Sequence, residues 1–154
     1  MLNAKYEALK NYLIESGNAT AEELTEDISA VYNESWETFE IIGNEYKVLT
    51  DDEADEKAAE YIKESLWVFN AEFILQHSAA FENTTTCEDE DIIKALRMVQ
   101  ENICESANAL VKALIYDIDT FIEDAIDADG RGHFLSSYDG EEHESNGFYV
   151  YRTN

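Results

Sequence analysis

Acidic side chains outnumber basic ones by 35 to 10, and any fold of this chain must carry the resulting net charge of −25. So much like charge costs stability through self-repulsion. Yet 45 % of the residues are hydrophobic, including nine Tyr, seven Phe and two Trp, which is too much apolar material for a disordered acidic segment. The 154 residues suffice for one packed domain. The sequence therefore predicts a folded acidic domain.

The charge also restricts what the chain binds. DNA, RNA and anionic membranes would repel it, so we expect no direct contact with any of them. The N-terminus lacks an apolar signal segment, and no apolar run approaches the roughly 18 residues that cross a bilayer. Cys87 and Cys104 form no disulfide framework, and we expect no bond between them in a reducing compartment. These features together indicate a cytoplasmic protein.

Apolar residues at helical spacing predict several helices. The first covers about residues 3–16, and Thr20 with Glu23 reads as a capping box that starts a second helix running to about residue 32. Thr50 and Glu53 form another such box, opening a helix whose apolar face continues to about residue 69. Asn70 is expected to interrupt it before a short helix over residues 72–77.

Residues 81–86 are expected to form a loop, after which Thr86 and Asp89 cap the longest helical stretch. Its apolar stripe extends over residues 91–127, which as one helix would be about 55 Å long. A domain of this size has a radius of gyration of only about 15 Å. Either the helix breaks near residues 106–108, or it reaches a second copy of the chain and makes a homodimer. We favour the break.

Two segments have the character of β-hairpins. Residues 38–49 contain two short β-prone runs on either side of Gly43-Asn44, a pair that suits a tight turn. Residues 133–152 alternate and are rich in aromatics, which predicts a second hairpin turning at Asp139-Gly140 or in the longer loop. We expect Trp36 and Trp67 in the core or at its edge. The fold class is thus mainly α with small β-hairpins (α+β), in a single domain over residues 1–154 with about four to six helices.

No motif supports catalysis or a cofactor. There is no Gly-x-Ser-x-Gly elbow, and residues 130–132 lack the glycine and lysine of the phosphate-binding fingerprints. Residues 127–138 resemble a calcium loop, but Arg131 stands at its fifth position and Tyr138 at its twelfth, where ligands are required. The histidines are spread over separate segments, at positions His77, His133 and His143. We therefore expect no enzyme activity, no metal and no cofactor.

The carboxylates are the remaining signal. Some complement the macrodipole at predicted helix N-termini, but Glu123, Asp124 and Asp127 fall in the final turns of the long predicted segment, where they oppose it. Few basic residues lie between the acids, unlike in an ordinary solvated surface. Two clusters are therefore candidates for binding a partner. Their members are Asp117, Asp119, Glu123, Asp124 and Asp127 in one, and Glu53, Glu56, Glu60 and Glu64 in the other.

The amount of charge suggests what that partner is. Duplex DNA carries one negative charge per about 1.7 Å, so 25 charges correspond to about 43 Å, or roughly 12 base pairs. This is close to the diameter expected for the fold. A rigid body with such a field could occupy the groove of a basic nucleic-acid-binding protein. The alternative is an acidic adaptor or regulator that binds a protein through an aromatic patch without mimicking DNA.

Residues 129–142, Asp-Gly-Arg-Gly-His-Phe-Leu-Ser-Ser-Tyr-Asp-Gly-Glu-Glu, together with Tyr-Val-Tyr-Arg at 149–152, resemble the C-terminal part of small acidic proteins of tailed bacteriophages. Residues 45–55 are also similar to segments of such proteins. These relatives are uncharacterised, so the resemblance implies a phage origin and no site residues. In overall charge and helicity alone, the chain resembles phage antirestriction and anti-CRISPR DNA mimics. The working hypothesis is a phage-encoded inhibitor of a host restriction, CRISPR-type or nucleoid protein.

Overall fold

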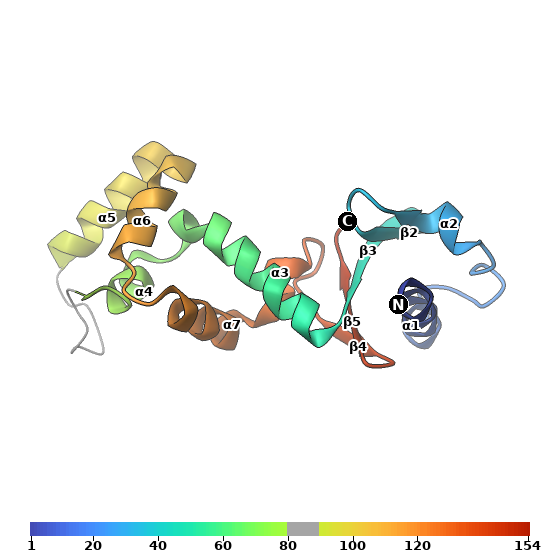
Figure 1. Ribbon diagram of the computed structural model, residues 1–154. Helices are drawn as coiled ribbons and strands as arrows, with labels where there is room; N and C mark the ends of the chain where they lie inside the picture. Colours follow the sequence, from blue (N-terminus) through green and yellow to red (C-terminus); the bar gives the residue numbers. More distant parts are fainter. Residues whose placement is uncertain (80–89) are drawn as a thin grey trace. The chain divides into compact units, whose positions relative to one another are not determined.

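The computed structural model describes residues 1–79 and 90–154 (Figure 1). Contacts within the chain define two units: a sheet unit, Met1–Ala58 with Asp129–Asn154, and a helical unit, Ala59–Ala128. Both boundaries fall inside helices, namely α3 (Asp51–Glu64) and α7 (Ile118–Leu135). The prediction of a mainly helical α+β fold with small β-hairpins is confirmed. That the whole chain forms one domain stays a prediction.

The sheet unit contains an antiparallel sheet with strand order β1-β2-β3-β5-β4 in the described part of the chain. The strands are β1 (Tyr32–Asn33), β2 (Thr38–Ile41), β3 (Asn44–Leu49), β4 (His143–Ser145) and β5 (Phe148–Arg152). Strands β3 and β5, which are distant in sequence, pair in the middle of the sheet, with Val48 opposite Val150. Both of these valines are buried. The short edge strands leave little open ladder to pair with another chain.

The hairpin predicted over residues 38–49 is confirmed, but its turn is displaced by one residue. Ile41 pairs with Asn44, so the two central residues are Ile42 and Gly43, with φ of 51° and 73°. A two-residue turn of this kind matches the twist of the strands it joins. Asn44 is therefore the first residue of β3, and the exposed Ile42 takes a conformation that is rare for a β-branched side chain.

The second hairpin is shorter than predicted. It turns at Asn146 and Gly147, both at positive φ, and not at Asp139-Gly140. The expected first arm at 133–138 is wrong, because α7 continues to Leu135 beyond a kink at Gly130 (φ 77°) and buries Phe134 and Leu135. The glycine interrupts the helix without ending it. Aromatic content alone does not separate such a short helical turn from a strand.

Helix α1 (Leu2–Glu15) confirms the first predicted helix and packs on the sheet (Figure 1). Tyr6, Leu9 and Leu13 contribute its buried face. They join Phe39 and Tyr46 of the sheet in one hydrophobic core, where the rings of Tyr6 and Phe39 stack with centroids 5.8 Å apart. The helical stripe read from the sequence is thus the contact face of this helix.

The predicted helix over residues 20–32 is wrong apart from its last turn, α2 (Ile28–Val31). The Glu23 carboxylate does accept from the backbone N–H and the hydroxyl of Thr20, at 2.9 and 2.8 Å, but this contact closes an isolated turn. The helix begins only after Asp27, whose carboxylate accepts from the N–H of Ser29 at 3.1 Å. A second capping residue downstream therefore sets the start of the helix.

The capping box at Thr50 and Glu53 is confirmed, and it opens α3. The Thr50 N–H donates to the Glu53 carboxylate at 2.8 Å, and the Glu53 N–H donates to the Thr50 hydroxyl at 3.3 Å. The helix ends at Glu64, earlier than predicted, and a 3-10 turn η1 (Leu66–Val68) follows. As expected, Asn70 then starts a short helix, α4 (Ala71–Gln76), by accepting from the N–H of Glu72 at 2.8 Å.

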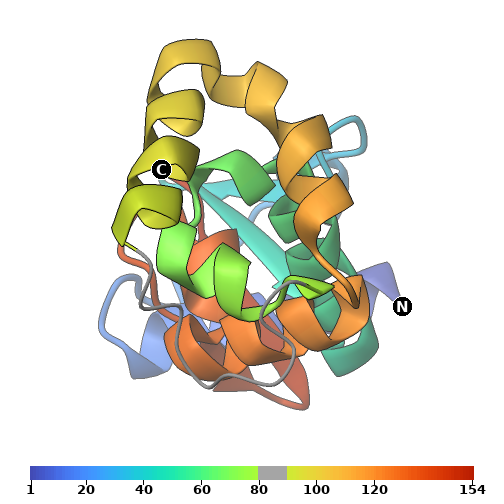
Figure 2. The same ribbon diagram turned by 90° about the vertical axis from the view of Figure 1, so that its left-hand side faces the viewer.

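The long segment breaks, as favoured, and it does so twice. Helix α5 (Glu90–Ile103) leads into the 3-10 turn η3 (Cys104–Ala107), and α6 (Asn108–Leu114) leads away from it (Figure 2). Residues 115–117 then separate α6 from α7. The unbroken helix that would reach a second copy is thus wrong. The expected loop at 81–86, the cap of Thr86 and Asp89, and Cys87 lie outside the described residues.

The side chain of Asn108 explains why the first break is stable. Its Oδ1 accepts from the backbone N–H of Trp67 at 3.0 Å, and its Nδ2 donates to the carbonyl of Lys63 at 2.9 Å. These bonds satisfy backbone groups at the end of α3 and in η1 that lack helical partners. The core of the helical unit includes Ile74 and Val111, both fully buried.

The two tryptophans differ. Trp67 is partly buried, consistent with a place at the edge of the core. Trp36 was expected there too, but it is 71 % exposed, so that prediction is wrong.

In the described ranges 1–79 and 90–154, no helix combines the length and apolar character needed to cross a membrane.

Candidate partner-binding surface

All five acids of the first candidate cluster are exposed and lie in the helical unit, at the start of α7 or along it. The break at residues 115–117 changes where these acids lie relative to a helix end, and therefore which of them serve the fold. Asp117 precedes the helix, and its carboxylate accepts from the N–H groups of Asp119 and Thr120 at 3.1 and 3.3 Å. Hydrogen bonds from Thr120, and then from Asp119, hold the pKa of Asp117 below its ordinary value. Asp117 is a helix N-cap, so helix formation alone accounts for it.

The expectation that Glu123 and Asp124 oppose a helix dipole is wrong for the same reason. Because α7 begins at Ile118 and is kinked at Gly130, both residues lie in the middle of its first straight stretch, outside the end turns where the dipole acts. Asp127 does lie in the last turn before the kink, as expected. Asp124 also has a local partner, since its carboxylate lies 2.9 Å from Nε2 of His77. The His77 ring packs among Phe73 and Phe121. Asp124 thus holds a largely buried histidine in place.

Three acids of this cluster have no such local role. Asp119, Glu123 and Asp127 are spaced four residues apart on α7, so successive members are separated by about 6 Å along the helix. In the part of the chain that the structure describes, no cationic nitrogen lies within 4 Å of any of them. Like charges at this spacing repel one another. This trio, which we call the α7 carboxylate row, is an ordered line of uncompensated negative charge.

The second candidate cluster lies on α3 and is divided between the units, with Glu53 and Glu56 in the sheet unit and Glu60 and Glu64 in the helical unit. Glu53 is occupied internally: besides its capping role, its carboxylate lies 2.5 Å from Nζ of Lys5. Burial alone would raise the pKa of Glu53, but the hydrogen bonds from Lys5 and Thr50 outweigh it and lower that pKa. The other three residues are exposed.

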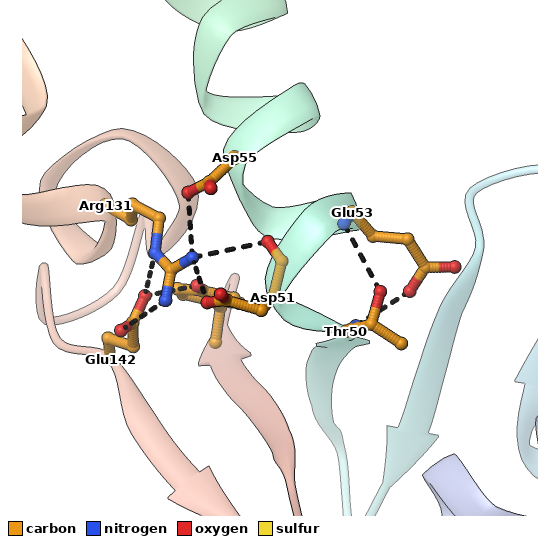
Figure 3. Close-up of polar contacts among 7 residues, drawn as sticks. Thr50, Asp51, Glu53, Asp55, Arg131 and Glu142 are labelled. Atoms are coloured by element: carbon orange, nitrogen blue, oxygen red, sulfur yellow. Dashed lines mark hydrogen bonds and ion pairs between the residues drawn. The ribbon is translucent and has the colours of Figure 1, made fainter. Parts of the chain in front are cut away.

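A charged cluster that the sequence did not reveal lies in the sheet unit, around Arg131 (Figure 3). Arg131 forms a two-pronged pair with Glu142, with Nε to Oε2 at 2.9 Å and the second nitrogen to Oε1 at 3.0 Å. Its remaining nitrogen donates to Asp51 at 2.7 Å and to Asp55 at 2.8 Å. These three carboxylates are thus neutralised in part by one cation. The signal in the sequence is a lone arginine in an acidic tract, which by itself reads only as a misfit in a calcium loop.

The packing around Arg131 uses residues 129–142 and 149–152 of the sheet unit. Its guanidinium lies 4.4 Å from the ring centroid of Tyr149, and the hydroxyl of Tyr151 donates to Glu142. Burial, and then the hydrogen bond to Glu142, raise the pKa of the Tyr151 phenol well above its ordinary value. A Cβ on Gly132 would lie 2.8 Å from the carbonyl carbon of Glu141, and closer still to the carbonyl oxygen of Gly140. These residues therefore hold the fold of the sheet unit together.

The described residues contain no group of three or more His, Cys, Asp or Glu side chains placed to hold a metal ion. The histidines are dispersed, with His77 in the helical unit, and His133 and His143 in the sheet unit. The ring of His143 stacks on Tyr12 with centroids 4.8 Å apart. Cys104 is an exposed thiol.

No protein family, no curated protein and no solved structure matches this chain.

Proposed function

We propose that this protein is a phage-encoded acidic mimic of nucleic acid, which acts in the bacterial cytoplasm. It inhibits or modulates a basic DNA- or RNA-binding protein of the host, of the restriction, CRISPR or nucleoid type. It is not an enzyme and does not itself bind nucleic acid.

The observation that supports this proposal most directly is the α7 carboxylate row. A mimic needs negative charges in a regular line on a rigid element, and Asp119, Glu123 and Asp127 supply one at helical spacing. The row is exposed and uncompensated among the described residues. Like-charge repulsion makes it a cost to the fold, and binding a cationic groove would offset that cost.

The structure also narrows which acids can take part. Asp117 caps a helix, Asp124 contacts His77, Glu53 binds Lys5, and Asp51 and Asp55 bind Arg131. These carboxylates serve the fold first. Charges without a local partner are the better candidates for replacing phosphates.

The test is capture of a partner from a bacterial lysate with the full chain, followed by competition with duplex DNA. A mimic should lose its partner as DNA is added, because the two occupy one groove. Binding should also weaken steeply between about 50 and 200 mM salt, as phosphate contacts do.

Two results would count against the proposal. Direct binding of DNA by the protein at low salt is incompatible with mimicry. A partner that duplex DNA does not displace, with an affinity nearly independent of salt, would favour the adaptor alternative.

A further inference from the structure

The turn between β1 and β2, residues 34–37 of the sheet unit, presents an exposed tryptophan on an ordered backbone. Trp36 is 71 % exposed. The side-chain oxygen of Asn33 accepts from the N–H of Ser35 at 3.0 Å and from that of Trp36 at 3.4 Å, which fixes the course of the turn. An aromatic side chain on a pre-ordered turn loses little conformational freedom on binding, and tryptophan is enriched among residues that dominate interfaces.

Carboxylates stand close to this indole in the chain. Glu34 and Glu37 are both exposed. Glu37 has φ of 54°, a conformation uncommon outside glycine, and its carboxylate lies 3.7 Å from Nζ of Lys57. In the described ranges, Glu34 has no cationic partner within 4 Å. An exposed indole beside carboxylates suits a guanidinium or ammonium group, which can pack on the ring and donate to the acid.

Glu37 also lines a pocket of about 430 Å³ in the same unit. Buried apolar side chains of the sheet, Phe39, Val48 and Leu49, form part of its wall. Two lysines and three glutamates also line it, and Lys5 pairs with Glu53 while Lys57 pairs with Glu37. Glu56 is the remaining carboxylate of the lining, and it has no cationic partner within 4 Å in the described residues. The volume is in the range of pockets that accept a small group. An apolar wall with one unpaired carboxylate, Glu56, fits an apolar side chain that adjoins a basic one.

We propose that Trp36 and this pocket form the docking surface for a basic segment of the partner protein. An arginine of that segment packs on Trp36 and meets Glu34 or Glu37, while a neighbouring apolar side chain enters the pocket. The inference rests on the proposed function in one respect, the basic character of the partner. It adds a local anchor to the diffuse attraction of the acidic surface, and charge complementarity selects this occupant over an acidic or neutral one.

The experiment uses the full chain with Trp67→Phe, so that Trp36 is the sole tryptophan and its fluorescence reports binding. Three short peptides serve as probes: repeats of Arg-Leu-Ser, of Arg-Ser-Ser and of Glu-Leu-Ser. The first should change the fluorescence saturably and bind more tightly than the second, and the third should not bind. Binding measured by calorimetry to the full chain with Trp36→Ala should be weaker by about tenfold, as expected from losing one cation–π contact.

Controls separate the anchor from bulk charge. Glu34→Gln with Glu37→Gln should weaken binding of the Arg-Leu-Ser peptide more than Glu15→Gln with Glu22→Gln, which removes as much charge from exposed positions elsewhere in the sheet unit. Equal binding by the Trp36→Ala chain, equal effects of the two double variants, or equal binding of the Glu-Leu-Ser peptide would each overturn the docking surface. The docking surface would also be overturned if the Trp36 fluorescence changed with the concentration of the protein and not with added peptide, because a second copy of the chain would then be the occupant.

This test is independent of the DNA competition. If the peptide binds at Trp36 but DNA does not displace the captured partner, mimicry fails and the docking surface stands. If DNA displaces the partner while the peptide ignores Trp36, the docking surface fails and mimicry stands.

Discussion

Arg131 and Glu142 form a two-pronged ion pair within the sheet unit, with both nitrogen–oxygen distances near 3 Å, at 2.9 and 3.0 Å. The Arg131 side chain is only 12 % exposed and also meets Asp51 and Asp55. One cation therefore holds three carboxylates from the start of α3 and from the segment before β4. Because the chain has only 10 basic residues for 35 acidic ones, the loss of this cation is hard to compensate.

Replacing Arg131 should destabilise the fold severely. Arg131→Met leaves Asp51, Asp55 and Glu142 facing one another, and we expect a loss of about 2 kcal/mol, less than for a fully buried pair because the two aspartates are well exposed. Arg131→Lys should recover part of the loss, since it keeps the charge without the planar fork. Urea unfolding measures both.

The matched control is Arg97→Met, which removes an arginine that is 52 % exposed and paired with Glu72 in the helical unit. Pairs as exposed as this contribute little, so the unfolding midpoint should hardly move. Equal effects of the Arg131 and Arg97 variants would show that the Arg131 cluster does not stabilise the sheet unit.

Gly132→Ala should be destabilising where helix propensity alone predicts the opposite. Alanine normally stabilises a helical position relative to glycine by roughly 1 kcal/mol. Here the added Cβ would meet backbone atoms of residues 140–142, among them the carbonyl carbon of Glu141 at 2.8 Å, and these cannot move aside cheaply. We expect a net loss of about 2 kcal/mol in the free energy of unfolding.

Gly43→Ala provides the comparison, because that glycine has a positive φ and open space around it. Its cost should be about 1 kcal/mol from backbone strain alone. A Gly132→Ala variant as stable as the natural chain would mean that the loop over residues 140–142 is not fixed against α7.

The residues that could be interpreted from the sequence are those whose structure is set locally. The stripe of α1, the Thr50–Glu53 capping box and the Asn70 helix start all depend on neighbours within one or two turns. The break at residues 104–107 followed from a length argument, although the bonds of Asn108 that stabilise it join residues more than 40 positions apart. The helix predicted from Thr20 failed because a local capping contact closes a turn as readily as it opens a helix.

The candidate site was less predictable, because the role assigned to each acid of the first cluster depended on where α7 begins. With α7 starting at Ile118, Asp117 is a helix cap, and Glu123 and Asp124, expected in the final turns of a longer helix, lie in the middle of the stretch before the kink at Gly130. The Arg131 cluster joins positions 51, 55, 131 and 142, and no periodic pattern reports such a meeting. Residue type alone places Trp36 in the core, whereas the Asn33 turn exposes it.

Acidic pH should selectively weaken the contribution of Glu53. Its pKa in the folded protein lies below the ordinary value of 4.5, because the bonds from Lys5 and Thr50 outweigh the effect of burial. Folding therefore favours the ionised form, and the stability it supplies is complete above the unfolded pKa and is lost as the pH falls through the folded pKa. The stability difference between the natural chain and Glu53→Gln should be constant at neutral pH and shrink below about pH 4.5.

The quantity to compare is the difference in unfolding free energy between the natural chain and Glu53→Gln. Protonating the other carboxylates also relieves repulsion, and this shifts the stability of both proteins together. Thermal unfolding of the two proteins across the acidic range provides it. A difference that grows as the pH falls would contradict the assignment of Lys5 and Thr50 as partners of the ionised carboxylate.

Neutralising the α7 carboxylate row should separate stability from partner binding. The triple change Asp119→Asn, Glu123→Gln and Asp127→Asn leaves the Asp117 cap and the Asp124–His77 contact intact. Relief of like-charge repulsion should make the fold no less stable. If the row replaces phosphates, affinity for the captured partner should fall, and the slope of its salt dependence should decrease by about one unit for each carboxylate removed. The matched control, Glu15→Gln with Glu22→Gln and Glu40→Gln, removes three charges from exposed positions in the sheet unit. Should both triple variants bind the partner equally, the row has no special part in binding, and only the net charge of the protein attracts its target.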